Sequence, residues 1–75
     1  MTRDRLTDLI IARLLRDHGQ SKHHWRAAIG PIRLYDRATH AHCNWNATPT
    51  GSARDVAVIE RLLDELRMTY PLLTG

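Results

Sequence analysis

The clearest pattern in the chain is the stretch His40-Ala41-His42-Cys43-Asn44-Trp45-Asn46-Ala47, in which polar and apolar residues alternate. Successive side chains of a β-strand point to opposite faces, so this alternation predicts a strand over residues 40–47. The apolar set is expected to face the core and consists of Ala41, Cys43, Trp45 and Ala47. The polar set is expected to face outward and consists of His40, His42, Asn44 and Asn46.

A second strand is expected just before this stretch. Ile32 and Leu34 alternate with Arg33 and Tyr35, which predicts a strand over residues 32–36 that begins after Pro31. Only a short polar connection separates it from residue 40. Because parallel strands need a much longer crossover, we expect the two strands to pair as an antiparallel hairpin.

Apolar residues spaced by three or four positions predict helices over residues 3–18, 21–29 and 53–70. A hydroxyl side chain that can cap the first turn stands before or at the start of each one: Thr2, Ser21 and Ser52. Glycine or proline, residue types that end helices, follows each one: Gly19, Gly30-Pro31 and Pro71. The middle helix is expected to be short.

These elements predict one α+β domain over residues 1–75, in the order helix, short helix, strand, strand, helix. A chain of 75 residues has room for one core only. A two-stranded hairpin is not stable by itself in water, so its apolar face is expected to pack on the amphipathic helices.

The cysteine content and hydropathy of the chain bear on its location. Cys43 is the only cysteine, which excludes a disulfide within one chain and suits a reducing compartment. The apolar run Leu9-Ile10-Ile11-Ala12 is bracketed by charged residues and is too short for a membrane span or a signal peptide. We therefore expect a cytoplasmic protein without a membrane partner.

The charge of the chain is positive and unevenly distributed. Lysine and arginine number 11 against 8 acidic residues, a net charge of +3. Residues 1–37 hold eight of the cations and four of the acids, whereas residues 38–75 hold three cations and four acids. A basic half can attract nucleic acid or an acidic protein. A genome that favours arginine produces the same bias, so charge alone does not choose a partner.

The outer face of the predicted hairpin is the main candidate binding surface. Its side chains combine hydrogen-bonding groups with rings and guanidinium planes that can stack on bases or on a protein. This face is expected to contain Arg33, Tyr35, Arg37, His40, His42, Asn44 and Asn46. Exposed strands more often carry Thr, Lys, Glu or Ser, although any solvated antiparallel sheet is polar on its outer side.

Metal binding and catalysis are poorly supported by the sequence. His40 and His42 share a face and are weak candidates for a metal site, but Cys43 is expected to point the other way and zinc needs three or four converging ligands. A buried Cys43 is also unsuited to act as a nucleophile. We expect neither a cofactor nor enzymatic activity.

Two functional hypotheses follow. The first is an interaction module that binds a protein partner, or a second copy of itself, through the hairpin, because a small core and exposed strand edges favour association. The alternative is a small nucleic-acid-binding protein that uses the outer sheet face together with a basic helix containing Lys22, His23 and Arg26.

Overall fold

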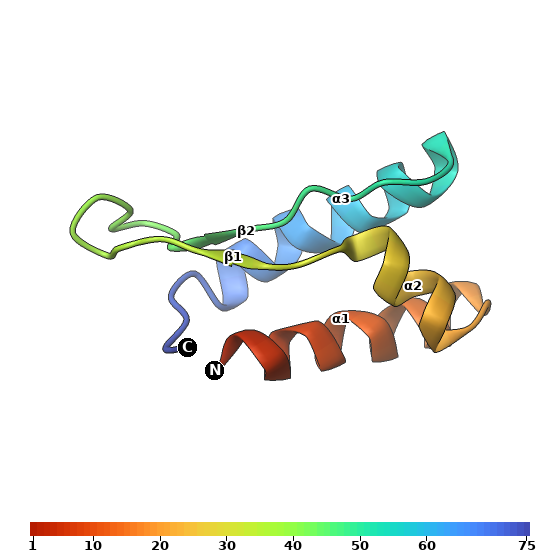
Figure 1. The fold of residues 1–75 in the computed structure, drawn as a ribbon, viewed down its shortest axis with the longest axis horizontal. Helices are drawn as coiled ribbons and strands as arrows, with labels where there is room; N and C mark the ends of the chain where they lie inside the picture. Colours follow the sequence, from red (N-terminus) through yellow and green to blue (C-terminus); the bar gives the residue numbers. More distant parts are fainter.

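The computed structural model describes residues 1–75 and contains three helices and a two-stranded antiparallel hairpin. The elements follow in the order α1 (Arg3–His18), α2 (Lys22–Ile29), β1 (Arg33–Leu34), β2 (Trp45–Asn46) and α3 (Ala53–Thr69). The predicted α+β class and the predicted order of elements are confirmed. Figure 1 shows α1 and α3 on opposite sides of the molecule, with α2 closing one end and the hairpin reaching past the other.

Each helix begins at a hydroxyl cap. The side-chain oxygens of Thr2, Ser21 and Ser52 each accept a hydrogen bond from the backbone N–H three residues further along, at 3.0 to 3.2 Å. These bonds satisfy donors that have no partner within the helix. α1 and α2 are followed by the C-cap residues Gly19 and Gly30, whose φ angles of 72° and 68° are accessible to glycine at little cost.

The strands are shorter than the sequence pattern predicts. Arg33 pairs with Asn46 and Leu34 with Trp45, and one further hydrogen bond, from the Tyr35 N–H to the Asn44 carbonyl at 2.7 Å, extends the ladder. Residues 36–44 lie outside the regular strands instead of continuing them. The reason is that the far part of the hairpin projects beyond the helices, where no apolar layer covers a strand face.

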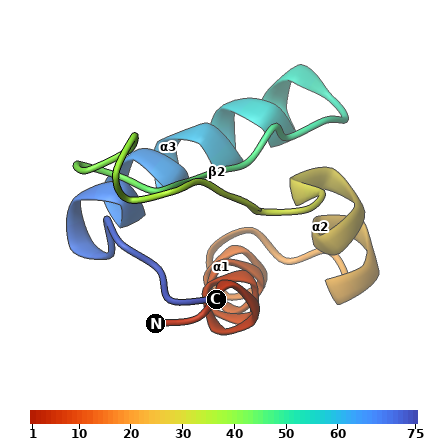
Figure 2. The same ribbon diagram turned by 60° about the vertical axis from the view of Figure 1, so that its left-hand side comes forward.

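The core lies between the helices and the inner side of the hairpin, and Figure 2 shows how these elements are arranged around it. The helices contribute Leu6, Ile10, Ile11 and Leu14 of α1, Trp25, Ala28 and Ile29 of α2, and Ile59, Leu62, Leu63 and Leu66 of α3. The rest of the core consists of Ile32, Trp45 and Ala47 in and beside the hairpin strands, and Leu73 in the C-terminal segment. Both tryptophan N–H groups are satisfied within it. Trp25 donates to the Gly19 carbonyl at 2.7 Å and Trp45 donates to the Tyr70 carbonyl at 2.8 Å. Burial of large aromatic rings is therefore achieved without an orphaned polar group.

The lengths and compositions of the three helices bear on membrane association. None of them is both long and apolar enough to cross a lipid bilayer.

Candidate interaction site at the hairpin tip

The part of the hairpin farthest from the helices forms a continuous exposed segment. Every residue from Tyr35 to His42 is exposed, and we refer to residues 35–42 as the hairpin tip. Figure 1 shows the tip as a loop that extends beyond the ends of the neighbouring helices. Its side chains are therefore accessible to a partner from several directions.

The tip has a defined conformation because Asp36 organises its turn. The Asp36 side chain accepts a hydrogen bond from the Ala38 N–H at 2.8 Å, the arrangement of an Asx-turn. The Asp36 carbonyl accepts from the N–H groups of Thr39 and His40 at 3.1 and 2.9 Å. These bonds connect residues only a few positions apart, so they hold the turn without help from the core.

Two aromatic rings of the tip stack on each other. The rings of Tyr35 and His40 have centroids 4.4 Å apart and planes inclined by 19°. The Thr39 hydroxyl and the Nδ1 atom of His40 lie 2.9 Å apart and form a hydrogen bond. Tyr35 and His40, both predicted for the outer face, are thus stacked on the projecting part of the molecule.

The predicted position of Asn44 on the outer face is wrong. Asn44 is only 4 % exposed, and its side chain contacts the C-terminal segment after α3. Its Nδ2 atom donates to the Leu73 carbonyl at 2.9 Å, and its Oδ1 atom accepts from the Leu73 N–H at 2.7 Å. Because this segment covers that side of residue 44, alternation along the strand did not reveal its burial.

The alternation also fails at Ala41, which is exposed although it was predicted to face the core. Residues 41 and 42 form a bend, and a bend does not send successive side chains to opposite faces. Cys43 is half-buried, and its thiol donates to the Trp45 carbonyl at 3.4 Å. Trp45 and Ala47 are buried as expected.

Arg37 lies within the tip, and Arg33 and Asn46 lie at its base in the two strands. Arg37 is exposed, but one guanidinium nitrogen donates to the Leu73 carbonyl at 3.2 Å. Asn46 is exposed and accepts a hydrogen bond from Arg67 at 2.6 Å, and that guanidinium also lies 5.5 Å from the centre of the Trp45 ring. Arg33 is exposed and forms no ion pair with an acidic side chain.

No group of three or more His, Cys, Asp or Glu side chains is positioned to hold a metal ion. His40 and His42 are both exposed on the tip, but the structure brings no third ligand of these types to them. One ring nitrogen of His40 is also engaged by Thr39.

The predicted basic helix is distant from the hairpin tip. Lys22, His23 and Arg26 are exposed on α2, which lies at the opposite end of the molecule from the tip (Figure 1). The hairpin tip and these three residues of α2 therefore do not form one continuous surface.

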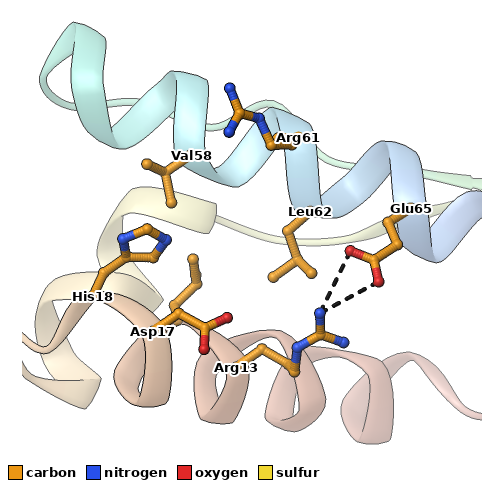
Figure 3. A pocket seen from close by; sticks show the side chains of 8 residues that line it. Arg13, Asp17, His18, Val58, Arg61, Leu62 and Glu65 are labelled. Carbon is orange, nitrogen blue, oxygen red and sulfur yellow. Dashed lines mark hydrogen bonds and ion pairs between the residues drawn. The ribbon is translucent and has the colours of Figure 1, made fainter.

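Sequence reasoning missed a small pocket between α1 and α3. It has a volume of about 110 Å³, and Figure 3 shows the charged side chains around it. Arg13 of α1 contacts Glu65 of α3 at 3.3 Å, and Asp17 and His18 lie nearby. The pKa of Asp17 is lowered, chiefly because Asp17 accepts a hydrogen bond from Arg16 and also because Arg16, Arg13 and His18 surround it with positive charge. No short-range sequence pattern connects these two helices.

A second polar contact that sequence reasoning missed joins α2 to α3. The Nε2 atom of His24 lies 2.9 Å from a carboxylate oxygen of Asp55, whose side chain is only 14 % exposed. Ser52 and Asp55 are three positions apart and form the cap of α3, but this local spacing gives no indication of a contact with a histidine of α2. The contact lies beside the buried Trp25. The rings of His24 and Trp25 are packed edge to face, with their centroids 4.9 Å apart.

Comparison of the chain with protein-family models, curated proteins and solved structures finds no match. The geometry of the hairpin tip is therefore the basis for assigning a function. The tip combines an ordered turn, stacked rings and nearby arginines on a part of the molecule that stands clear of the core.

Proposed function

We propose that this protein is a small interaction module that binds a partner protein through the hairpin tip. The observation that carries the proposal is the ordered exposure of residues 35–42, held by the Asp36 turn and the stack of Tyr35 on His40. A loop that already has its bound conformation loses little conformational entropy on binding. Tyrosine and arginine are also enriched at the centres of protein interfaces.

The charges around the tip favour a partner with an acidic surface. Arg33 and Arg37 carry two positive charges against the one negative charge of Asp36, whose carboxylate accepts a hydrogen bond from the Ala38 N–H in the turn. Self-association through the tip would bring the same arginines of two copies together, and like charges across an interface oppose binding. We therefore favour a different protein over a second copy at this site, and the single cysteine suits a partner in the cytoplasm.

Binding of nucleic acid is the competing outcome of the test. The stacked rings of the tip, together with Arg37 and the neighbouring Arg33, are groups that also contact single-stranded nucleic acid. The distance between the tip and the basic residues of α2 weighs against one continuous track for a nucleic-acid backbone. The two outcomes differ in their salt dependence, because contacts to phosphates release counterions.

The proposal is tested with two matched double variants. Arg33→Ala/His40→Ala, the tip variant, removes one exposed side chain of the tip and the exposed Arg33 of β1 beside it, and Arg5→Ala/Arg54→Ala, the control variant, removes two exposed cations elsewhere. Proteins captured by the wild-type chain are identified by mass spectrometry, and the best one is purified and titrated against all three chains. We expect the tip variant to bind it at least about tenfold more weakly and the control variant to bind normally.

Equal affinity of the tip variant and the control variant for every purified partner would refute the proposal. Labelled single-stranded and duplex oligonucleotides are titrated in parallel at several salt concentrations. Steeply salt-dependent binding that the tip variant loses would replace the protein partner with nucleic acid.

A further inference from the structure

A groove between α1 and α2 contains charged groups that have no partner within the molecule. It holds the largest depression of the surface, about 370 Å³, bordered by Asp8, Lys22 and Arg26 around the apolar side chains of Ile11, Ala12 and Leu15. A second depression of about 300 Å³ shares Arg26 and continues toward the start of α1. We call the two depressions together the α1–α2 groove.

The two walls of this groove have opposite charge. Asp8 lies on α1, whereas Lys22 and Arg26 lie on α2. None of these three side chains takes part in any of the four ion pairs of the molecule, and all three are exposed. The second depression adds Arg3 and Asp4, whose charges balance each other. The groove therefore presents one acidic and one basic wall.

We propose that the α1–α2 groove is the surface through which two copies of this chain associate. A two-fold rotation about an axis along the groove would lay the acidic wall of each copy over the basic wall of the other. Such an isologous interface uses one self-complementary patch on both subunits, and each contact of Asp8 with Lys22 or Arg26 occurs twice. A uniformly acidic partner would instead oppose Asp8 and Asp4.

Several properties of the groove fit this occupant. Leu15 and the exposed Ala12 provide an apolar centre, and the small alanine side chain permits another helix to approach α1 closely. A chain of this length buries a small core, and self-association is a common source of added stability for such domains. The groove is also separate from the hairpin tip, so a dimer formed here would leave both tips free.

The first measurement is the sedimentation velocity of the wild-type chain from micromolar to millimolar concentration at low salt. We expect a concentration-dependent shift from monomer to dimer, weakened as salt screens the wall charges. A strict monomer throughout this range would overturn the proposal without any variant.

The second measurement uses charge reversal on one wall at a time. Asp8→Lys makes both walls basic, and Lys22→Glu/Arg26→Glu makes both walls acidic. Each variant alone should dimerise at least about tenfold more weakly than the wild type, because like charges face each other across its own interface. Circular dichroism establishes that each variant is folded, and Lys22→Glu alone replaces the double variant if that one unfolds.

Mixing the two reversed variants distinguishes association from any effect within one chain. In a mixed dimer the introduced lysine faces the introduced glutamates, and the native Asp8 of one copy faces the native Lys22 and Arg26 of the other. We expect the mixture to dimerise more tightly than either variant does alone. A mixture that stays monomeric would overturn the proposal. Dimerisation of each reversed variant alone that is as tight as that of the wild type would also overturn it.

The variant Arg33→Ala/His40→Ala serves as the control for association through the hairpin. It should dimerise like the wild type. If it loses dimerisation while the reversed-wall variants keep it, the contact lies at the tip and the groove proposal is refuted.

Discussion

The side chain of Asn44 forms two hydrogen bonds with the backbone of Leu73, donating to its carbonyl at 2.9 Å and accepting from its N–H at 2.7 Å. The amide of Asn44 thereby pairs with a segment 29 residues away as another strand would. Arg37 donates to the same Leu73 carbonyl at 3.2 Å. The side chains of Asn44 and Arg37 thus hold the hairpin to the C-terminal segment after α3 through the backbone of Leu73.

Replacing Asn44 should destabilise the fold far more than replacing Asn46. Asn44→Ala leaves the buried Leu73 N–H without an acceptor, so we expect a loss of about 1–3 kcal/mol in the free energy of unfolding. Asn46→Ala is the matched control, because that amide is exposed. Urea denaturation followed by tryptophan fluorescence measures both. Equal losses for the two variants would contradict the assigned role of Asn44.

The burial of Leu63 on α3 predicts a second difference in stability. Leu63 is 0 % exposed and Met68 is 87 % exposed on the same helix. Leu63→Ala should cost about 2–5 kcal/mol because it leaves a cavity, whereas Met68→Ala should change stability by less than about 0.5 kcal/mol. Ile59→Val, with an expected cost of about 0.5–1.5 kcal/mol, replaces Leu63→Ala if the larger truncation abolishes folding. A marked loss on Met68→Ala would show that this exposed side chain is covered in solution.

The contact between His24 and Asp55 should appear as energetic coupling between α2 and α3. A double-mutant cycle with His24→Ala and Asp55→Ala is expected to give a coupling of about 0.5–1.5 kcal/mol, the usual net value of a hydrogen bond. The Arg67 and Asp64 pair within α3 is the control, because the Asp64 side chain is 76 % exposed and such helical pairs contribute about 0.2–0.5 kcal/mol. Additive effects of the His24 and Asp55 substitutions would indicate that the two side chains do not interact in solution.

The environment of Asp17 predicts how its carboxylate titrates. Its pKa is lowered, chiefly by the hydrogen bond from Arg16 at 2.9 Å. The ionised carboxylate therefore contributes stability above the pKa that it has in the unfolded chain, and this contribution disappears as the pH falls through the lower folded-state value. The contribution should be small and should decrease with salt, because the pair is exposed.

An NMR titration of the Asp17 carboxyl carbon measures this shift directly. The midpoint should lie below the ordinary value for aspartate, and Arg16→Gln should raise it. A midpoint that Arg16→Gln leaves unchanged would assign the shift to other neighbours.

The helices were predictable from the sequence because their determinants are local. A cap residue and the N–H that it satisfies are three positions apart, as at Thr2, Ser21 and Ser52. The apolar stripe of each helix is likewise visible within a few turns, and the three stripes supply most of the core residues. The order of elements then leaves few arrangements that cover a two-stranded hairpin.

The hairpin was only partly predictable. Alternation correctly assigned Trp45 and Ala47 to the core, but it failed at Ala41 and Asn44. A period of two shows which side chains share a face of a regular strand, and it contains no information on where the strand ends or what covers its other face. The Asp36 turn ends the regular pairing, and the segment with Leu73 covers Asn44.

Alternation along the chain predicted an outer hairpin face with arginine, tyrosine and histidine side chains, and the single cysteine excluded a disulfide within one chain. The contacts that shape the candidate surfaces depend instead on residues far apart in the chain, such as Asn44 with Leu73, His24 with Asp55 and Arg13 with Glu65. The separation of the hairpin tip from Lys22 and Arg26, and the facing walls of the α1–α2 groove, arise from helix packing in the same way. Local patterns do not encode these placements, because each one results from how several elements share a single core.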